Sequence, residues 1–279
     1  MQPLVLKFGG ELLEEPSRMA GVVAAVADIV KGSATSAVPV VLVHGGGKEI
    51  DAALRTAGIE KRQVDGLRIT DAATLAIVVS VLAGAVNTRF VAALGAAGVP
   101  AVGLTGADGG CGLSDVAPPH RTVAGELADL GRVGLPAADA DMRVLEALLR
   151  SGMVPVVASI GVDREGQLLN VNADTMAGHL AAKLGARRLV IAGSTPGVLD
   201  ERGTTVPLLD PASIARLVAA GTANAGMIAK LRACEHALGG GVDDVVIVDG
   251  RDRDSLRAAA SGTVPAPATR VAATAGTRS

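Results

Sequence analysis

The fold is predicted first from one stretch near the amino terminus, Leu4-Val5-Leu6-Lys7-Phe8-Gly9-Gly10. Apolar residues flank a single lysine and two glycines follow, which is typical of a short buried strand that ends in a tight turn. A lysine on such a strand is costly to bury unless an anion meets it. The glycines would let backbone N–H groups approach a phosphate closely. Taken alone, the stretch equally fits a lysine that reaches solvent from an edge strand.

A second glycine-rich strand end strengthens the anion-binding interpretation. It is Val41-Leu42-Val43-His44-Gly45-Gly46-Gly47, and a helix is predicted directly after it. Further apolar strands are predicted over residues 100–104, 154–160, 188–192 and 244–248, the last being the final strand. Continuous apolar strands separated by helices favour a parallel α/β sheet covered on both faces. Ligands bind such open sheets at the carboxyl ends of the strands.

Two hairpins and one long helix are predicted between these strands. Residues 60–69 are polar and alternate, and Arg164-Glu165-Gly166 has the composition of a hairpin turn. Thr70 is predicted to be the N-cap of a helix that runs to about Ala96. The apolar run at its start is short for a membrane span and indicates a buried helix. Residues 109–130 are predicted to be rich in loops.

Composition limits the classes of function. The chain has 279 residues, enough for one large α/β domain or two small ones. Its net charge of −2 argues against generic nucleic-acid binding, and Phe8 and Phe90 are its only aromatic residues, which argues against base stacking. Two cysteines are too few for a disulfide framework or a zinc site. A reduced cytoplasmic compartment is expected, with no signal peptide and no membrane partner.

Single motifs leave the chemistry open. Neither a Walker A motif nor Gly-x-Gly-x-x-Gly occurs where a strand enters a helix, which disfavours P-loop ATPases and Rossmann dehydrogenases. Arg68 could hold a carboxylate with its forked guanidinium or be solvated. Asp174 could simply stabilise a helix amino terminus, and Lys230 could be a solvated helix lysine. The four histidines share no ligand spacing, and no Ser–His–Asp arrangement stands out.

The order and spacing of these residues resemble the amino-acid kinase family, and most of all its acetylglutamate kinases, from Leu4 to about Val271. Besides the two glycine-rich strand ends, the most specific segments are Asp65-Gly66-Leu67-Arg68-Ile69-Thr70 and Ser159-Ile160-Gly161 continuing into Asn170-Val171-Asn172-Ala173-Asp174. The resemblance implies an α/β fold with an open, mainly parallel eight-stranded sheet sandwiched between helices in three layers, as in carbamate kinase. It also implies one domain, residues 1–279.

The resemblance further implies two lobes and an activity. Residues 1–170 would bind the acyl amino acid and dimerise, residues 171–271 would bind ATP, and residues 272–279 would be a disordered tail. The implied reaction is ATP-dependent phosphorylation of the γ-carboxylate of N-acetyl-L-glutamate to N-acetyl-L-glutamyl 5-phosphate, in arginine biosynthesis. A cytoplasmic homodimer is expected. The chain lacks the additional amino-terminal helix of arginine-inhibited hexameric relatives, so insensitivity to arginine is expected as well.

The resemblance assigns a role to each matching residue. Lys7 and Lys230 would stabilise the transferring phosphoryl group, and Asp174 would orient both lysines. The residues implied to hold N-acetylglutamate are Gly46, Gly47, Arg68 and Asn170, with Arg68 on the α-carboxylate. Those implied to face the nucleotide are Gly9, Gly10, Ser194, Thr195, Gly197, Asn224, Gly226 and Met227. Mg²⁺ would arrive with ATP, held largely by phosphates and water, and no protein metal site is implied.

These roles fit what phosphoryl transfer requires. Negative charge spreads over the equatorial oxygens in the transition state, so fixed cations and N–H donors matter more than a base. The acceptor carboxylate is already ionised at neutral pH, since a free Glu has a pKa of about 4.3. One departure is Ser194-Thr195-Pro196-Gly197, where family members often carry Asp-Val-x-Gly. This departure removes an acidic group from the adenosine side of the site.

Three alternatives stay open at this point. A kinase of carrier-protein-linked aminoadipate or glutamate in lysine biosynthesis is close in chemistry, but such relatives tend to differ in the 170–174 segment. N-succinylglutamate or N-acetylaminoadipate could be the substrate, because one methylene gives only about 1–3 kcal/mol of discrimination. A non-catalytic sensor of an amino acid or nucleotide is the third alternative. Retention of both lysines and Asp174 argues against a sensor.

Overall fold

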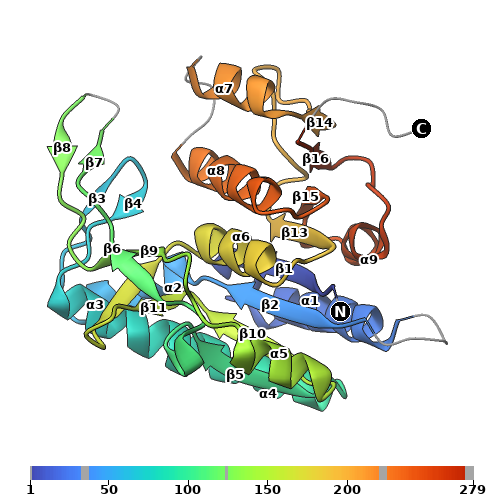
Figure 1. The fold of residues 1–279 in the computed structure, drawn as a ribbon, viewed down its shortest axis with the longest axis horizontal. Helices are drawn as coiled ribbons and strands as arrows, with labels where there is room; N and C mark the ends of the chain where they lie inside the picture. The colour runs from blue at the N-terminus through green and yellow to red at the C-terminus, as the bar shows by residue number, and fades with distance from the viewer. Residues whose placement is uncertain (1, 33–37, 123–124, 220–224, 274–279) are drawn as a thin grey trace.

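One large sheet organises the protein (Figure 1). The computed structural model describes residues 2–32, 38–122, 125–219 and 225–273. Within them the sheet contains β1 (Leu4–Phe8), β2 (Val40–His44), β5 (Ala101–Thr105), β10 (Val154–Ala158), β13 (Arg188–Gly193), β14 (Leu208–Leu209), β15 (Val245–Asp249) and β16 (Thr269–Val271). Its order is β14-β16-β15-β13-β1-β2-β10-β5, and β1 pairs in parallel with both β2 and β13. Only the β15–β16 pairing is antiparallel, so the predicted eight-stranded, mainly parallel sheet is confirmed.

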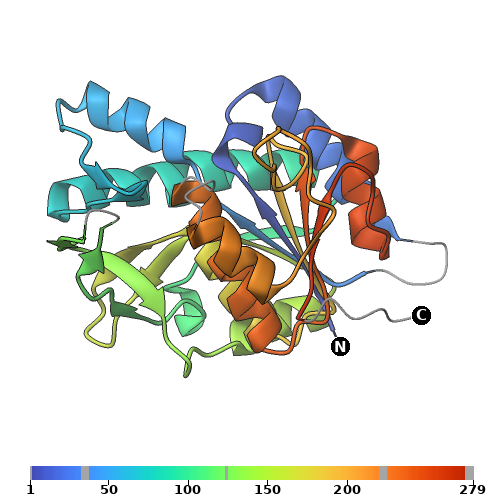
Figure 2. The same cartoon turned by 90° about the horizontal axis from the view of Figure 1, so that it is seen from above.

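Helices cover both faces of the sheet and complete three layers (Figure 2). One face carries α1 (Pro16–Lys31), α2 (Gly47–Thr56), α3 (Ala72–Val79), α4 (Asn87–Ala96) and α9 (Arg253–Ser261). The other face carries α5 (Arg143–Arg150), α6 (Ala173–Lys183), α7 (Pro211–Ala219) and α8 (Ala225–Gly239). Alternate residues of a strand point to opposite faces. Leu4 and Leu6 therefore pack in the first core and Val5 in the second.

A smaller sheet and two hairpins lie beyond the carboxyl ends of the central strands. The smaller sheet contains β6 (Ser114–Val116), β9 (Val133–Pro136), β11 (Ile160–Val162) and β12 (Leu168–Val171). The hairpins are β3–β4 (Gln63–Val64 and Leu67–Arg68) and β7–β8 (His120–Arg121 and Leu127–Ala128). The hairpins predicted over residues 60–69 and around Gly166 are confirmed, and Gly166 has a φ of +82° that favours glycine.

A continuous helical stretch runs from Ala72 to Ala96, as predicted. Its middle, Ser80–Val86, is a π-helix that joins α3 to α4. The predicted cap at Thr70 is wrong, because Asp71 is the N-cap and accepts a hydrogen bond from the Thr74 N–H. This stretch is the one described helix long and apolar enough to cross a membrane. Its buried residues pack into the first core, and 39% of its most apolar window is buried inside the molecule.

The structure adds elements that the sequence pattern did not show. The strand over residues 244–248 is not the last, because α9 and then β16 follow it. β16 has only three residues and returns antiparallel to β15, so it lacks the length of a recognisable apolar run. Likewise, β6, β7 and β8 lie within the segment predicted to be rich in loops.

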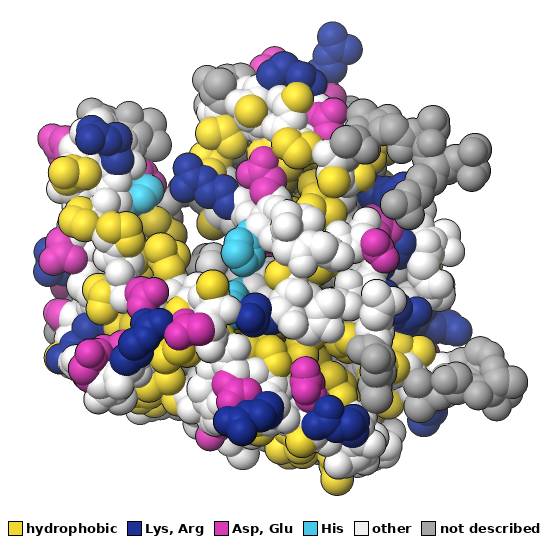
Figure 3. Space-filling model, in the orientation of Figure 1, with side chains coloured by type: hydrophobic (Ala, Val, Ile, Leu, Met, Phe, Trp, Pro, Cys, Tyr) yellow, Lys and Arg dark blue, Asp and Glu magenta, His cyan; other side chains and the backbone are white. Residues whose placement is uncertain are grey.

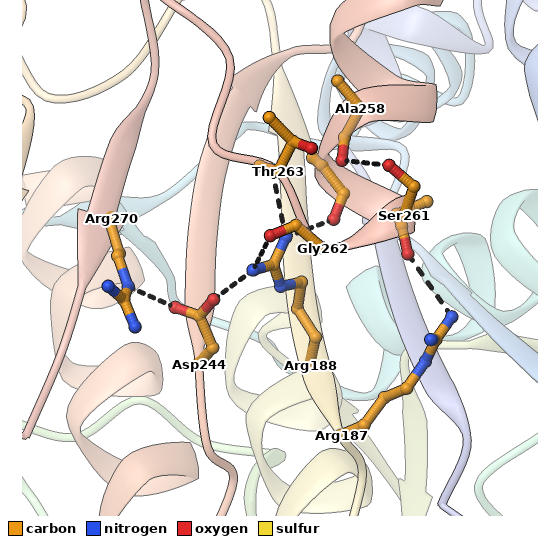
Figure 4. A network of polar contacts seen from close by, with 10 residues as sticks. Arg187, Arg188, Asp244, Ala258, Ser261, Gly262, Thr263 and Arg270 are labelled. Carbon is orange, nitrogen blue, oxygen red and sulfur yellow. Dashed lines mark hydrogen bonds and ion pairs between the residues drawn. The ribbon is translucent and has the colours of Figure 1, made fainter. Parts of the chain in front are cut away.

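A buried network at the opposite end of the sheet fastens α9 to the strands (Figure 4). Arg188 at the start of β13 forms an ion pair with Asp244, and Asp244 also accepts a hydrogen bond from Arg270 Nε at 2.9 Å. The Arg188 guanidinium donates as well to the carbonyl oxygens of Ala259, Gly262 and Thr263. The network therefore satisfies carbonyl groups at the carboxyl end of α9 that the helix itself leaves unpaired.

Candidate functional site

Lys7 and Asp174 form a buried ion pair at the centre of the sheet. Lys7 lies on β1 and points to the same face as Val5, the face that α6 covers. Its Nζ atom lies 2.8 Å from Oδ1 of Asp174, and both side chains are nearly inaccessible to solvent. Asn172 is the N-cap of α6 and accepts hydrogen bonds from the N–H groups of Asp174 and Thr175. Asp174 is therefore not needed as a cap and is free to pair with Lys7.

Lys230 brings a second cation to the same carboxylate. It lies on α8, which packs closely against α6. Burial lowers the pKa of Lys230 most strongly, the Asp174 carboxylate raises it, and the charge of Lys7 lowers it further. Among the described residues, Lys230 has no ion pair within 4.0 Å. The site thus holds two cations around one anion, an arrangement that favours binding of a further anion.

The two glycine-rich strand ends touch each other. A Cβ on Gly10 would lie 2.6 Å from the Cα of Gly46, and a Cβ on Gly46 would lie 2.9 Å from the Leu82 side chain. The Gly9 N–H donates to the Ala192 carbonyl at 3.0 Å, so this N–H is engaged here and the contact of Gly9 with a nucleotide stays a prediction. In the described part of the chain, the N–H groups of Gly10, Gly46 and Gly47 have no acceptor. These three donors form a small anion-binding surface.

Arg68 lies beside the second glycine turn and keeps one nitrogen free. Its Nη2 donates to Asp51 at 2.5 Å and to the Gly47 carbonyl at 3.3 Å, which fixes the guanidinium plane. Nη1 is buried without a hydrogen-bond partner among the described residues. A buried, unpaired guanidinium N–H is costly unless a ligand accepts from it. The free edge of Arg68 is therefore suited to a carboxylate.

Asn170 is placed near Arg68 through Thr70. Its Nδ2 donates to the Thr70 hydroxyl at 3.0 Å, and that hydroxyl donates to the Arg68 carbonyl at 3.1 Å. Thr70 is fully buried. The structure therefore links the 65–70 and 170–174 segments, although they are far apart in the sequence.

The other residues predicted to face the nucleotide lie after β13 and around the start of α8. Ser194 and Thr195 follow β13 and have accessible side chains. Gly197 packs so closely that a Cβ would meet Thr269 at 2.5 Å, so the structure gives this glycine a packing role and its contact with a nucleotide stays a prediction. Gly226 and Met227 begin α8, the helix that carries Lys230. Asn224 lies outside the described residues.

A cavity of about 680 Å³ separates the hairpins from α8. The space-filling view shows this face hollowed between them (Figure 3). Leu67 and Asn172, the sequence neighbours of two predicted site residues, belong to its lining, together with Arg232 and His236 of α8. His120 of β7 and Asp65 of the other hairpin also line it and form an ion pair at 2.9 Å. This contact ties the hairpin that carries Arg68 to its neighbour.

His44 and Glu11 belong to the site region but were not assigned a role from the sequence. His44 is fully buried, and burial lowers its pKa to about 4 although the Gly45 carbonyl opposes the shift. Its Nε2 lies 3.0 Å from Asn87 Nδ2, so Nε2 accepts and Nδ1–H donates to Gly45. Glu11 directly follows the first glycine pair. The sequence signal that could have pointed to His44 and Glu11 was their position, since each residue adjoins a glycine-rich turn.

The arrangement is suited to phosphoryl transfer. Lys7, Lys230 and the unpaired N–H groups lie at the carboxyl ends of the central strands or beside them, and positive charge that is preorganised in this way is what a phosphoryl transition state requires. The two glycine turns approach so closely that a side chain at position 10 or 46 would meet atoms already in place. Among the described residues no cluster of three His, Cys, Asp or Glu could hold a metal ion by itself. A divalent cation would therefore depend on the oxygens of a bound phosphate.

Comparison with known proteins gives consistent matches. The model of the amino acid kinase family matches residues 2–249. An acetylglutamate kinase from Novosphingobium aromaticivorans is 42% identical over 256 residues, which cover 88% of this chain and 83% of that protein. An acetylglutamate kinase from Rhizorhabdus wittichii is 43% identical over 255 residues, which cover 90% and 83%. Among solved structures, the Giardia carbamate kinase is similar in fold, with a TM-score of 0.68, 14% identity and coverage of 98% and 99%.

Proposed function

This chain belongs to the amino acid kinase family, and we propose that its site transfers the terminal phosphoryl group of ATP to the side-chain carboxylate of N-acetyl-L-glutamate. The enzyme is a phosphotransferase with a carboxyl acceptor, and its product is N-acetyl-L-glutamyl 5-phosphate, an intermediate of arginine biosynthesis. One observation carries the proposal: Lys7 is held by Asp174 at 2.8 Å, and Lys230, whose pKa the same carboxylate raises, lies at the neighbouring strand end, 3.4 Å from the position of a Cβ on Gly193.

The lysines and the glycine turns act on the transferring group. As the bond to the leaving oxygen lengthens, negative charge spreads over the phosphoryl oxygens. Lys7 is held in place by its ion pair with Asp174, and Lys230 has a free charge to offer. The N–H of Gly10 lies at the carboxyl end of β1, where it can donate to the same oxygens. Fixed donors of this kind need no reorganisation during the reaction.

Arg68 and Asn170 act on the acceptor. The free Nη1 of Arg68 supports binding of the α-carboxylate of N-acetylglutamate, and Asp51 keeps the guanidinium from turning away. Asn170 is held by Thr70 on the same side. The γ-carboxylate is ionised at neutral pH and attacks phosphorus directly, so no side chain has to remove a proton. None of the proposed roles is that of a general base, which is consistent with this chemistry.

ATP is the phosphoryl donor, and Mg²⁺ would accompany it. The N–H groups of Gly10, Gly46 and Gly47 are available to donate to the triphosphate, because none of them has an acceptor among the described residues; the Glu11 side chain lies beside the first turn. The nucleoside end of ATP would face Ser194, Thr195, Gly226 and Met227. This assignment rests on the positions of these residues in the family pattern. Mg²⁺ bound to the phosphates would neutralise part of their charge.

The alternatives gain no specific support from the structure. A sensor would not require a buried lysine whose pKa is lowered by its surroundings, because binding could be achieved with solvated cations. A carrier-protein-linked substrate would need an entrance for its linker, and nothing in the described residues distinguishes one. N-acetyl-L-glutamate therefore stays the proposed acceptor, and related acyl amino acids are compared with it in the activity assay.

A cytoplasmic homodimer is part of the proposal. Small residues at every fourth position of the 72–96 helix are exposed: Ala76, Ser80, Gly84 and Thr88. β5 forms the adjacent edge of the central sheet and leaves backbone groups available for pairing. A second copy related by a twofold axis could cover both features. Light scattering coupled to gel filtration should give twice the chain mass, and a monomer or a hexamer would contradict this assembly.

One assay tests the activity. Hydroxylamine traps the acyl phosphate, so hydroxamate formation should require ATP and Mg²⁺ and should be fastest with N-acetyl-L-glutamate. Glutamate, aspartate and N-acetylaminoadipate serve as competing acceptors in parallel reactions. Hydroxamate from none of the four would refute the kinase proposal. Faster turnover of N-acetylaminoadipate would keep the reaction class but change the substrate.

A further inference from the structure

The side chain of Glu11 lies inside the phosphoryl-binding region. Glu11 is the middle residue of a short 3₁₀ helix, Gly10–Leu12, that begins where β1 ends. Both of its carboxylate oxygens lie 2.4 Å from the position that a Cβ on Gly9 would occupy. Only a glycine at position 9 therefore leaves room for this carboxylate. The side chain folds back over the end of β1 rather than pointing to solvent.

The Glu11 carboxylate also faces the second lysine. Its Oε1 lies 3.6 Å from the position of a Cβ on Gly193, and Lys230 Nζ lies 3.4 Å from that same position. The charge of Glu11 helps to raise the pKa of Lys230 against the effect of burial. Glu11, Lys230 and the glycine turn thus surround one small space at the carboxyl ends of β1 and β13.

Glu11 has no partner for its carboxylate in the part of the chain that the structure describes. Its backbone carbonyl accepts from Arg18, but no hydrogen bond or ion pair reaches its side chain. The neighbouring acids differ: Glu14 pairs with Lys48 and Glu15 pairs with Arg18. Asp174, the other carboxylate in the catalytic centre, is occupied by Lys7. Glu11 therefore has both carboxylate oxygens free, whereas Glu49 beside the Gly46 turn uses one of its oxygens to pair with Arg89 and leaves only the other without a hydrogen bond.

A free carboxylate at this place repels a bare triphosphate but attracts a divalent cation. Mg²⁺ in kinase sites is commonly held by one or two carboxylates together with substrate phosphates. We propose that Glu11 supplies an oxygen ligand, directly or through a bound water, to the divalent cation that accompanies ATP. The inference rests on the proposed kinase function and adds a protein ligand where phosphates and water alone were expected.

A second role for Glu11 predicts opposite results. The carboxylate could occupy the anion site as a stand-in for phosphate and be displaced when ATP binds. Such a stand-in would accept hydrogen bonds from Lys230 or from the N–H of Gly10, and the structure shows neither. The carboxylate oxygens of Glu11 instead accept no hydrogen bond from the described residues, which favours a cation as their partner.

The test compares nucleotide affinity with and without the metal. A non-hydrolysable ATP analogue is titrated calorimetrically into wild type, Glu11→Gln and Glu15→Gln, once with Mg²⁺ and once with EDTA. With Mg²⁺, Glu11→Gln should bind the analogue about tenfold or more weakly than wild type does. With EDTA, the two proteins should bind it almost equally. Glu15→Gln removes an equal charge from the same loop and should behave as wild type. Mn²⁺ binding to the analogue complex, followed by electron paramagnetic resonance, should weaken in the same variant.

The outcomes separate this inference from the kinase proposal. If the ratio of the affinity with Mg²⁺ to the affinity with EDTA is the same in Glu11→Gln as in wild type, the ligand role is overturned. If Glu11→Gln binds the analogue more tightly than wild type both with Mg²⁺ and with EDTA, the stand-in role is established instead. Glu11→Asp keeps the charge on a shorter side chain and should retain an intermediate Mg²⁺ dependence, which excludes a simple folding defect. Wild type that forms no hydroxamate refutes the proposed function, whereas active wild type with an unchanged ratio refutes only the role of Glu11.

Discussion

Lys230 illustrates how a functional group is held at the expense of stability. Burial disfavours its charged form, and the carboxylates of Asp174 and Glu11 compensate in part. Lys7 has a direct ion pair at 2.8 Å, but Lys230 has none among the described residues. Lys230 is partly buried, and a partly buried cation without a direct partner destabilises the folded state. In the proposed reaction, the anion that Lys230 meets would offset this cost.

Replacing Lys230 should separate activity from stability. Lys230→Met keeps a side chain of similar length and removes the charge, so kcat should fall by about 100-fold or more. The melting temperature should stay the same or rise, because a buried, incompletely paired charge is gone. Steady-state hydroxamate assays and thermal unfolding measure the two effects. Lys31→Met, at the exposed carboxyl end of α1, is the control, and a large loss of stability in Lys230→Met would contradict this account.

Arg68 should be sensitive to shape as well as charge. Arg68→Lys keeps the positive charge but cannot bond to Asp51 and a ligand carboxylate with one rigid fork. KM for N-acetylglutamate should rise about tenfold or more, while KM for ATP should change little. Arg62→Lys, on the same hairpin, should leave both values unchanged. An equal rise in both KM values would mean that the substitution disturbs the whole site.

At the scale of elements, the site depends on two strand ends that lie side by side. β1 and β2 pair in register, with Phe8 opposite His44, so their glycine turns leave the sheet at the same level. His44 holds the second turn in place through its hydrogen bonds with the Gly45 carbonyl and the Asn87 side chain. Asn87 follows the π-helix and also donates to the Val156 carbonyl at 2.9 Å. The helix, three strands and both turns are therefore packed as one unit.

This packing predicts the effect of a single methyl group. Gly10→Ala would place a Cβ 2.6 Å from the Gly46 Cα, which forces the two turns apart. The chain should still fold, but kcat should fall by about tenfold or more because the donors lose their relative positions. The control is Gly21→Ala on α1, where nothing lies within 4 Å of the added group. Kinetics and circular dichroism of both variants give the comparison, and a fully active Gly10→Ala would show that the turns can adjust.

At the scale of the whole molecule, two buried histidines couple folding to pH. Burial lowers the pKa of His44 and of His179 to about 4, and the neighbouring His236 adds to the effect at His179. Both side chains are almost inaccessible, and they lie on different elements, β2 and α6. In the unfolded chain a histidine has a pKa near 6.5. The unfolded state therefore binds more protons than the folded state between these values.

Stability should therefore fall on the acid side of neutrality. Each depressed histidine contributes stability that is fully present above about pH 6.5 and is lost as the pH falls towards 4, at about 1.4 kcal/mol per pH unit. Urea unfolding at several pH values should show this slope. His179→Leu should make the slope shallower, whereas His120→Gln on the accessible hairpin should not. A stability that stays constant from pH 7 to pH 4.5 would contradict the assignment of neutral buried histidines.

The sequence alone determined the elements whose signals are local. Apolar runs that end in glycine predicted β1 and β2, and both hairpins were found from their polar alternation or turn composition. The family pattern also related Lys7 to Asp174, which lie 2.8 Å apart, whereas the roles of the site residues stay predictions. Local signals failed where a partner decides the outcome, as for Thr70, which is held by Asn170 while Asp71 caps the helix. The three-residue β16 exists only because β15 and β14 lie beside it.

Only the tertiary structure decided how the charges balance. Lys7, Asp174 and Lys230 come from a strand and two helices that are distant in the sequence, and no local pattern specifies a 2.8 Å ion pair for one lysine and none for the other. The free Nη1 of Arg68 and the unpaired carboxylate of Glu11 are likewise visible only once their surroundings are known. The physical reason is that residue type sets a charge locally, whereas burial and distance, which set its energy, depend on segments far apart in the chain.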